Sequence, residues 1–233
     1  MSKINILGVE IDDVSLDQAV NVVTEWLNDK KKYYIVTPNP EFIIAAQKDN
    51  VFRNILNDAD LSIPDGIGLR LSGRIKNRVA GVDLMERLIE KASQNGSKLG
   101  FLGGQKGVAD RCAERLRQRY PQLNISFVSD GGFVDQKGDS ERYKIPPTDI
   151  LFVAFGHGKQ ERWIYKNLNI YPVRIMMGVG GSLDYLSGAM LRAPKLLRSV
   201  GLEWLFRLVL QPWRIKRQLK LVNFIYLLLF KDK

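Results

Sequence analysis

The sequence predicts an α/β protein in which a mainly parallel sheet is flanked by helices and followed by a basic helical C-terminal appendage. Short apolar runs alternate with segments of helical spacing up to about residue 190, and such alternation is typical of parallel sheets. Small and polar residues follow most of the apolar runs, where an open sheet of this class binds its ligand. Basic residues concentrate in the last segment, among leucine and tryptophan.

Strands are predicted where short apolar runs end at glycine, proline or polar residues. In chain order these runs are residues 4–9, 33–36, 59–63, 98–102, 124–128, 150–155 and 173–179. Helices are predicted where apolar residues recur at helical spacing. They cover residues 16–27, 41–47, 51–56, 84–93 and 108–119. Residues 69–71 begin a further helical stretch directly after the third strand.

The composition of the 233 residues excludes several classes of protein. An apolar content of 45% is ample for a core, and the single cysteine, Cys112, excludes an intrachain disulfide framework. Residues 1–8 lack the pattern of a signal peptide, and no apolar run approaches the roughly 20 residues of a spanning helix. We therefore expect a cytoplasmic protein unless its surface binds a membrane.

Positive charge is concentrated late in the chain. The net charge is +10 and the pI is about 9.7, which indicates polyanionic partners such as nucleic acid, anionic lipid or phosphorylated substrates. In the late segment only Glu203 opposes seven basic residues. These are Lys195, Arg198, Arg207, Arg214, Lys216, Arg217 and Lys220.

Loops rich in small and polar residues follow the predicted strands. They lie at residues 37–41, 64–66, 103–105, 130–132, 156–161 and 178–182. Glycine at a strand-to-helix turn exposes backbone N–H groups that bind phosphate well, so several such turns favour a phosphorylated ligand such as a nucleotide. The chain contains neither G-x-G-x-x-G nor the Walker A pattern, which weighs against dinucleotide and P-loop sites.

The segment Pro64-Asp65-Gly66-Ile67-Gly68 is the most informative of these loops. A carboxylate at a strand end, with glycine beside it, occupies the place where open α/β folds hold their chemistry. As a local pattern the segment also fits a plain proline–glycine turn with a capping aspartate. Its position among the other glycine-rich loops is what makes Asp65 a candidate site residue.

Six groups of residues, in this order, together resemble the WecG/TagA/CpsF family of glycosyltransferases. They are Thr37-Pro-Asn-Pro-Glu41, Pro64-Asp-Gly-Ile-Gly68, Arg78-Val-Ala-Gly-Val-Asp83, Gln160-Glu161, Gly178-Val-Gly-Gly181 with Asp184, and Arg192-Ala-Pro194 followed by Gly201-Leu-Glu-Trp-Leu205 and Arg207. The resemblance runs from the first strand to about Arg217. It implies a Rossmann-like fold and an inverting enzyme that transfers a sugar from a UDP-sugar to an undecaprenyl-diphosphate-linked sugar.

The best-known branch of that family moves N-acetylmannosamine onto lipid-linked N-acetylglucosamine, at the start of wall teichoic acid linkage synthesis. Other members use N-acetylmannosaminuronic acid or glucose. The resemblance therefore implies a UDP-sugar donor and a polyprenyl-diphosphate-linked acceptor, with no obligatory cofactor. No metal site is expected either, because the Asp58-Ala59-Asp60 triplet precedes its strand instead of following it.

The resemblance also assigns roles to individual residues. Asp65 matches the catalytic base, and one base suffices for inversion in a single displacement. Thr37 and Asn39 match residues that orient the acceptor sugar, Arg78 a cation near the diphosphates, and Gln160 another active-site polar group. The residues implied for UDP-sugar binding are Gly103, Gly104, Gly156, Glu161, Gly178, Gly180, Gly181 and Asp184.

Ordinary structural roles remain open for several of these residues. Thr37 and Asn39 could cap the next helix, Arg78 could be a solvated surface charge, and Asp184 could cap the helix that follows the last glycine loop. Gln160 and Glu161 could be first-turn residues favoured by the helix dipole.

His157, the only histidine, precedes a glycine that stands where many family members have proline. It could contact phosphate or acceptor, or be a structural residue.

Residues 1–193 are expected to form the catalytic domain, and residues 194–233 a basic amphipathic appendage that binds the membrane. Helices of this type lie in the lipid interface, where each Lys or Arg near anionic lipid contributes about 1 kcal/mol. Packing of this segment on the core or on a second subunit is the alternative. The resemblance implies that the appendage closes over the active site and that Arg207, Arg214 and Arg217 reach a diphosphate.

Three functions are compatible with the sequence. The favoured one is a UDP-sugar-dependent glycosyltransferase, peripheral on the inner face of the cell membrane, with an anionic membrane surface and, in a homo-oligomer, further copies of the chain as partners. A soluble nucleotide-binding oxidoreductase is the second, and it lacks a dinucleotide fingerprint. A nucleic-acid-binding protein is the third, and it would bind with steep salt dependence; no nucleic-acid partner is expected.

Overall fold

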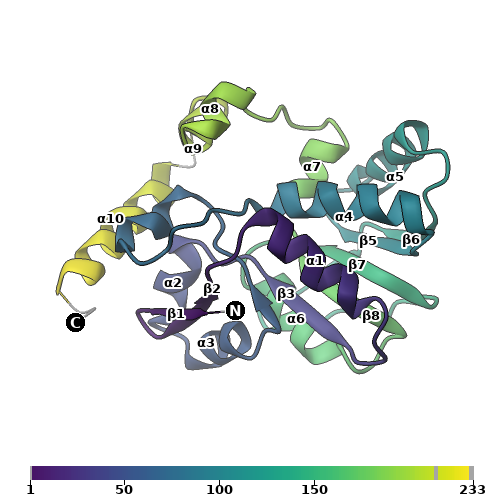
Figure 1. Cartoon of the computed structure of the whole chain (residues 1–233), viewed down its shortest axis with the longest axis horizontal. Coiled ribbons are helices and arrows are strands. Elements are labelled where there is room, and N and C mark those ends of the chain that lie inside the picture. The colour runs from purple at the N-terminus through teal and green to yellow at the C-terminus, as the bar shows by residue number, and fades with distance from the viewer. Residues whose placement is uncertain (1, 213–214, 231–233) are drawn as a thin grey trace.

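A wholly parallel, six-stranded sheet forms the centre of the protein in the computed structural model, which describes residues 2–212 and 215–230 (Figure 1). The strand order is β4-β3-β8-β7-β5-β6. The strands are β3 (Tyr33–Val36), β4 (Leu61–Ser62), β5 (Leu99–Gly103), β6 (Ile125–Ser129), β7 (Thr148–Ala154) and β8 (Val173–Gly178). The predicted α/β class with a parallel sheet is confirmed.

The N-terminal prediction of one strand over residues 4–9 is wrong. Two short strands, β1 (Lys3–Ile6) and β2 (Val9–Asp12), form an antiparallel hairpin outside the main sheet. Leu7 and Gly8 connect them, and both have positive φ angles of 51° and 85°. A two-residue hairpin turn needs this conformation, but leucine rarely adopts it. The sequence therefore conceals a turn inside what reads as one apolar run.

Helices cover both faces of the sheet, as the alternation of elements predicts. One face packs against α1 (Leu16–Trp26), α4 (Gly81–Asn95), α5 (Val108–Arg119) and α7 (Ser182–Leu186). The other packs against α2 (Pro40–Ala46), α3 (Asn50–Asn57), α6 (Lys159–Asn167) and the hairpin. Alternate residues of β7 enter the two cores: Phe152 one, Leu151 and Val153 the other. A 3₁₀ helix, η1 (Ile67–Ser72), follows the Asp65 loop.

The C-terminal segment is helical. It comprises α8 (Lys195–Ser199), α9 (Glu203–Leu210) and α10 (Ile215–Phe230). In Figure 1, α8 and α9 lie at the top, between α10 and α7, while α10 lies beside α2, and Phe224 of α10 is fully buried in the core of that face. Arg214 lies outside the described residues, and so does the side chain of Arg217.

Many apolar side chains of this C-terminal segment are exposed. They include Leu196, Val200, Trp204, Leu205, Val209, Leu210, Ile215, Leu219, Val222, Ile225, Tyr226, Leu229 and Phe230. An apolar surface of this extent is unusual for a monomer in water and marks an interaction site. None of the helices that the structure describes is long and apolar enough to cross a bilayer.

Candidate active site

Two adjoining cavities open at the edge of the sheet where the strands end. The first, of about 460 Å³, lies beyond β3, β4, β7 and β8, with α9 and α10 contributing to its wall. The second, of about 360 Å³, lies beyond β5, β6, β7 and β8. Gly156, Gly180 and Gly181 line both cavities. Open α/β sheets bind their ligands at this edge, so the pair of cavities is the candidate active site.

Asp65 lines the first cavity. Its loop is held in place by backbone hydrogen bonds, since the Asp65 N–H donates to the Pro38 carbonyl at 2.9 Å. The N–H of Gly81, at the start of α4, donates to the Asp65 carboxylate at 3.3 Å. Burial raises the pKa of Asp65 to about 6, although Arg207 and the Gly81 N–H act against that rise. A carboxylate that ionises near neutral pH suits a general base.

Thr37 and Asn39 follow β3 and line the same cavity. Asn39 is also the N-cap of α2, because its side-chain oxygen accepts hydrogen bonds from the N–H groups of Glu41 and Phe42. The predicted capping role of Asn39 is therefore confirmed, while its side chain still borders the cavity. Thr37 is buried against Gly81, where an added Cβ would come within 3.1 Å of the threonine methyl.

Gln160 and Glu161 lie in the first turn of α6 and are both buried. Gln160 lines the first cavity, whereas Glu161 and Gly178 line neither. Glu161 accepts a hydrogen bond from the Gly158 N–H at 2.7 Å and closes the first turn of the helix, as one of the structural alternatives predicts. Burial raises the pKa of Glu161 to about 7.

Arg207 and Glu203 of α9 reach the first cavity and form an ion pair with a 3.3 Å N–O distance. The Arg207 guanidinium also lies over the Tyr185 ring, 4.7 Å from its centre. Of the three arginines that the sequence assigns to a diphosphate, Arg207 is the one whose side chain is described, and it faces this cavity.

Arg192 connects the C-terminal helices to α4. Its guanidinium lies 2.5 Å from Asp83, 3.3 Å from Glu86 and 3.9 Å from Glu203. Arg192 is largely buried, Glu203 likewise, and Asp83 and Glu86 are partly exposed. This cluster fixes α9, and with it Arg207, relative to the start of α4, whose Gly81 contacts Asp65.

Arg78 lines neither cavity. Its Nη2 donates to the carbonyl of Arg198 in α8 at 3.0 Å, so it joins the Asp65 loop to the C-terminal segment. Its positive charge is still near enough to Asp65 to act against the rise in the pKa of that carboxyl. Its assignment to the diphosphates remains a prediction.

The first cavity also holds a charged pair that the sequence did not single out. Lys220 of α10 lies 3.6 Å from Glu41 of α2, and both line the cavity. Glu41 belongs to a motif that the sequence does reveal. The sequence marks Lys220 as one of the late basic residues but not as a site residue, because its place in the site depends on how α10 packs against α2.

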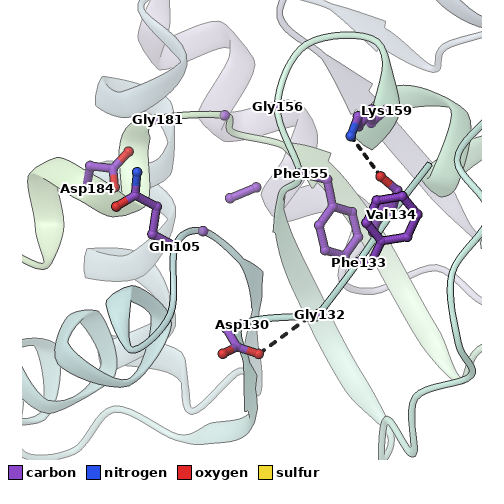
Figure 2. A pocket seen from close by; sticks show the side chains of 13 residues that line it. Gln105, Asp130, Gly132, Phe133, Val134, Phe155, Gly156, Lys159, Gly181 and Asp184 are labelled. Atoms are coloured by element: carbon purple, nitrogen blue, oxygen red, sulfur yellow. Dashed lines mark hydrogen bonds between the residues drawn. The ribbon is translucent and has the colours of Figure 1, made fainter. Parts of the chain in front are cut away.

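The second cavity is shown in Figure 2. Gln105 and Asp184 face each other on one side, with Phe133, Phe155 and Lys159 opposite. Lys159 donates to the Val134 carbonyl at 2.8 Å. Of the two predicted glycines after β5, Gly104 lines this cavity. The backbone of Gly103, with φ of 103°, lies against Ala154, where a Cβ would come within 2.7 Å of backbone atoms.

Asp184 lies in the first turn of α7, and no side chain caps that helix. Asp130 also lines the second cavity, and its carboxylate accepts a hydrogen bond from the Gly132 N–H. The sequence identified the loops of this cavity by their glycines. It did not single out Gln105, Asp130 or Phe133, which are the side chains that face the space.

His157 borders the first cavity and packs edge-on against Phe42, with ring centres 4.4 Å apart. It also lies against Phe52 at 5.6 Å. These contacts give it a packing role, one of the two that the sequence left open. In residues 2–212 and 215–230, no three His, Cys, Asp or Glu side chains gather closely enough to hold a metal ion.

Comparison with known proteins identifies the family. A sequence profile described as "Glycosyl transferase WecG/TagA/CpsF family" matches residues 4–233. Among curated proteins, the chain is 34% identical to the N-acetylglucosaminyldiphosphoundecaprenol N-acetyl-beta-D-mannosaminyltransferase of Staphylococcus aureus strain NCTC 8325 / PS 47, over 97% of this chain and 91% of the relative. The protein of the same name from strain MRSA252 shows the same identity and coverage. The resemblance found in the sequence motifs is confirmed.

Proposed function

Because the chain belongs to the WecG/TagA/CpsF family of glycosyltransferases, we propose that it transfers N-acetylmannosamine from UDP-N-acetylmannosamine to undecaprenyl-diphosphate-linked N-acetylglucosamine. Family membership makes the protein a sugar-transferring enzyme. The name of the staphylococcal relatives supports this acceptor and this transferred sugar. The product would be a linkage unit of wall teichoic acid or of a related surface polysaccharide. UDP-linked N-acetylmannosaminuronic acid and glucose are the alternative donors.

The two cavities suit the two substrates. The second has the backbone N–H group of Gly181 for phosphate, and Asp184 to accept hydrogen bonds from uracil or ribose. The first has Thr37 and Asn39 beside Asp65, where an acceptor sugar can be oriented. The anomeric carbon of the donor would then lie near the glycines that both cavities share.

Asp65 is the observation on which the proposed chemistry rests. It would take the proton from the acceptor hydroxyl as that oxygen attacks the anomeric carbon, with UDP leaving from the opposite face. One such base is enough for inversion in a single step. A pKa of about 6 leaves Asp65 ionised at neutral pH and makes it a stronger base than an ordinary aspartate.

Charge on the leaving UDP and on the lipid diphosphate would be balanced by the protein. Arg207 and Lys220 supply two cations in the first cavity, and guanidinium groups bind diphosphate oxygens in a bidentate manner. Backbone N–H groups of the glycine loops act in the same sense. We propose that the transfer proceeds without a bound divalent cation.

The acceptor is a lipid, so the site must meet the membrane. The exposed apolar side chains of α8, α9 and α10 lie among basic residues, a combination that binds the interface of anionic membranes. We propose that the protein is peripheral on the inner face of the cell membrane. Co-sedimentation with anionic vesicles, and its loss on removing residues after Pro194, tests this.

The chemistry is tested with D65N, assayed for UDP release with UDP-N-acetylmannosamine and a lipid-linked N-acetylglucosamine analogue. The variant should lose at least about 100-fold in kcat, which is within the usual contribution of a general base. D58N, in the Asp-x-Asp triplet, is the control. It should stay active, because Asp58 lies at the surface, where its carboxylate accepts a hydrogen bond from the Tyr165 hydroxyl. Near-wild-type turnover by D65N would refute the role of Asp65.

Parallel assays with the three UDP-sugars would identify the donor. Preference for UDP-glucose or for the uronic acid would replace the proposed substrate while leaving the mechanism in place. Full activity after treatment with EDTA is expected, because the leaving charge is assigned to protein groups.

A further inference from the structure

Glu161 and Gln160 form a buried polar pair whose members have different surroundings. Glu161 is wholly inaccessible to solvent and lines neither cavity, whereas Gln160, 2% exposed, lines the first. Nε2 of Gln160 donates to Oε1 of Glu161 at 2.7 Å. The Gly158 N–H donates to the other oxygen of Glu161, also at 2.7 Å. A buried carboxylate with two donors has its hydrogen bonds well satisfied.

The other end of the Gln160 carboxamide is held as firmly. Its Oε1 accepts the N–H of Gly180 at 3.0 Å. A carboxamide turned by 180° would place its oxygen against the Glu161 carboxylate and its NH₂ against the Gly180 N–H. With Glu161 ionised, both of these contacts are repulsive, because they pair acceptor with acceptor and donor with donor; with Glu161 protonated, the Gly180 contact is still repulsive. The two neighbours therefore select one orientation of the side chain.

Gly178 makes room for this arrangement. A Cβ at position 178 would come within 2.8 Å of Gln160 Nε2 and 3.0 Å of Glu161 Oε1. The end of β8 therefore packs directly on the hydrogen bond between the two side chains. No residue with a side chain could occupy position 178 without moving Gln160 or Glu161.

The hydrogen-bond count leaves one donor of Gln160 unused. Nε2 carries two hydrogens, and Glu161 takes one of them. Within the described residues, the bond to Glu161 is the one hydrogen bond that Nε2 donates. Gln160 lines the first cavity, where substrate oxygens are expected to bind.

We propose that Glu161 is a positioning residue, which holds Gln160 so that the carboxamide presents an N–H, and not its carbonyl oxygen, to a substrate oxygen in the first cavity. The acceptor on the substrate is an anionic or carbonyl oxygen, such as that of a diphosphate or an N-acetyl group. This inference rests on the proposed transferase function. It moves Glu161 from direct UDP-sugar binding to the support of another residue.

The exchange variant Q160E/E161Q tests the proposal. The carboxamide, now at position 161, can donate its NH₂ to the carboxylate at position 160 and accept from the Gly158 N–H. The carboxylate at position 160 accepts from Gly180, so each bond of the pair has a counterpart. What changes is the group that faces the cavity, which becomes a carboxylate without a hydrogen. The kcat should fall about 100-fold, the usual loss when one donor to a reacting group is removed. Q160A should fall by a similar factor.

Positioning by Glu161 is tested separately with E161M, which keeps the bulk but accepts no hydrogen bond. It should lower kcat by about tenfold or more while changing the KM for the UDP-sugar little, because the freed carboxamide can turn. Combined with Q160A it should cause no further loss, since the function of Gln160 is then already gone. Near-ultraviolet circular dichroism would confirm that each variant is folded.

Two results would overturn the proposal. One is an exchange variant whose kcat stays within about threefold of wild type over a pH series, because restored bonds would then suffice without the donor. The other is a double variant, E161M/Q160A, whose loss in kcat equals the product of the two single losses. Glu161 would then act independently of Gln160. If E161M fails to fold, the exchange variant and Q160A still test whether Gln160 must supply a hydrogen-bond donor.

Amide hydrogen exchange separates failure of this inference from failure of the proposed function. The Gly180 N–H should exchange faster in Q160A than in wild type, with no substrate present, because it loses its acceptor. If wild type turns over none of the UDP-sugars, the proposed function is wrong, and unchanged exchange at Gly180 would overturn the positioning as well.

Discussion

Replacing Asp65 by asparagine should stabilise the protein while abolishing its activity. The folded structure raises the pKa of Asp65 from 3.8 to about 6, chiefly by burial. An ionised carboxylate at this position is therefore less favourable in the folded state than in the unfolded chain. Asparagine carries no charge, and its side-chain oxygen can still accept the hydrogen bond from the Gly81 N–H.

The size of the effect follows from the pKa. A rise from 3.8 to about 6 is roughly two units, and at 1.36 kcal/mol per unit this amounts to about 3 kcal/mol. Because one side of Asp65 faces an open cavity, solvent screening reduces the expected gain to about 2 kcal/mol. For a chain of this length that raises Tm by about 4–8 °C.

The gain should depend on pH in a defined direction. Below pH 3.8 the carboxyl is protonated in both states, so D65N and wild type differ little. Between 3.8 and about 6 the unfolded chain releases its proton first, and wild type therefore loses stability relative to D65N as pH rises. Above about pH 6 the difference is constant.

Urea unfolding at pH 4, 6 and 8 measures this directly, because the free energy of unfolding is linear in urea. D17N is the matched control, since Asp17 is largely exposed and pairs weakly with Arg87 at 3.7 Å. It should change stability by less than about 0.5 kcal/mol. If D65N is no more stable than wild type at pH 8, the inferred cost of burying Asp65 is wrong.

Three further substitutions test other parts of the site. R192A removes the cation shared by three carboxylates, of which two are partly exposed and two keep another arginine. This should cost about 1 kcal/mol and speed proteolysis before α9, whereas the exposed Arg87→Ala should do neither. G178A has no room for its Cβ beside the buried glutamine–glutamate pair, so kcat should fall at least about tenfold with the fold retained; an active variant would contradict that packing. Arg207→Met removes a cation that lowers the pKa of Asp65, so the acid limb of the pH–rate profile should move to higher pH, and a shift to lower pH would refute this placement.

Much of the candidate site follows from strand order alone. Parallel strands end at one edge, so the loops after β3, β4, β7 and β8 must lie near one another. Thr37, Asp65 and Gln160 come from three of these loops, and all line the first cavity. Their glycines and short polar residues are visible in the sequence because such turns need them.

The pattern of apolar residues gave a wrong prediction where the backbone takes a conformation that the residue rarely adopts. Leu7 with positive φ turns the predicted first strand into a hairpin. Arg78 is a separate case: its guanidinium bonds a backbone carbonyl of α8, and its assignment to the diphosphates stays a prediction. Both observations depend on contacts with residues distant in the sequence.

The periodicity of apolar residues and the spacing of glycines were enough to predict the sheet and the edge that carries the site, and the resemblance of six motifs indicated the family. They could not predict which side chains face the cavities and which ones support another residue. Glu161 stands beside Gln160 in the chain, but burial and two hydrogen bonds turn it into a support. Lys220 reaches Glu41 from the far end of the chain because α10 packs on α2. The raised pKa of Asp65 likewise arises from desolvation, against which Arg207 acts, and no short motif encodes this environment.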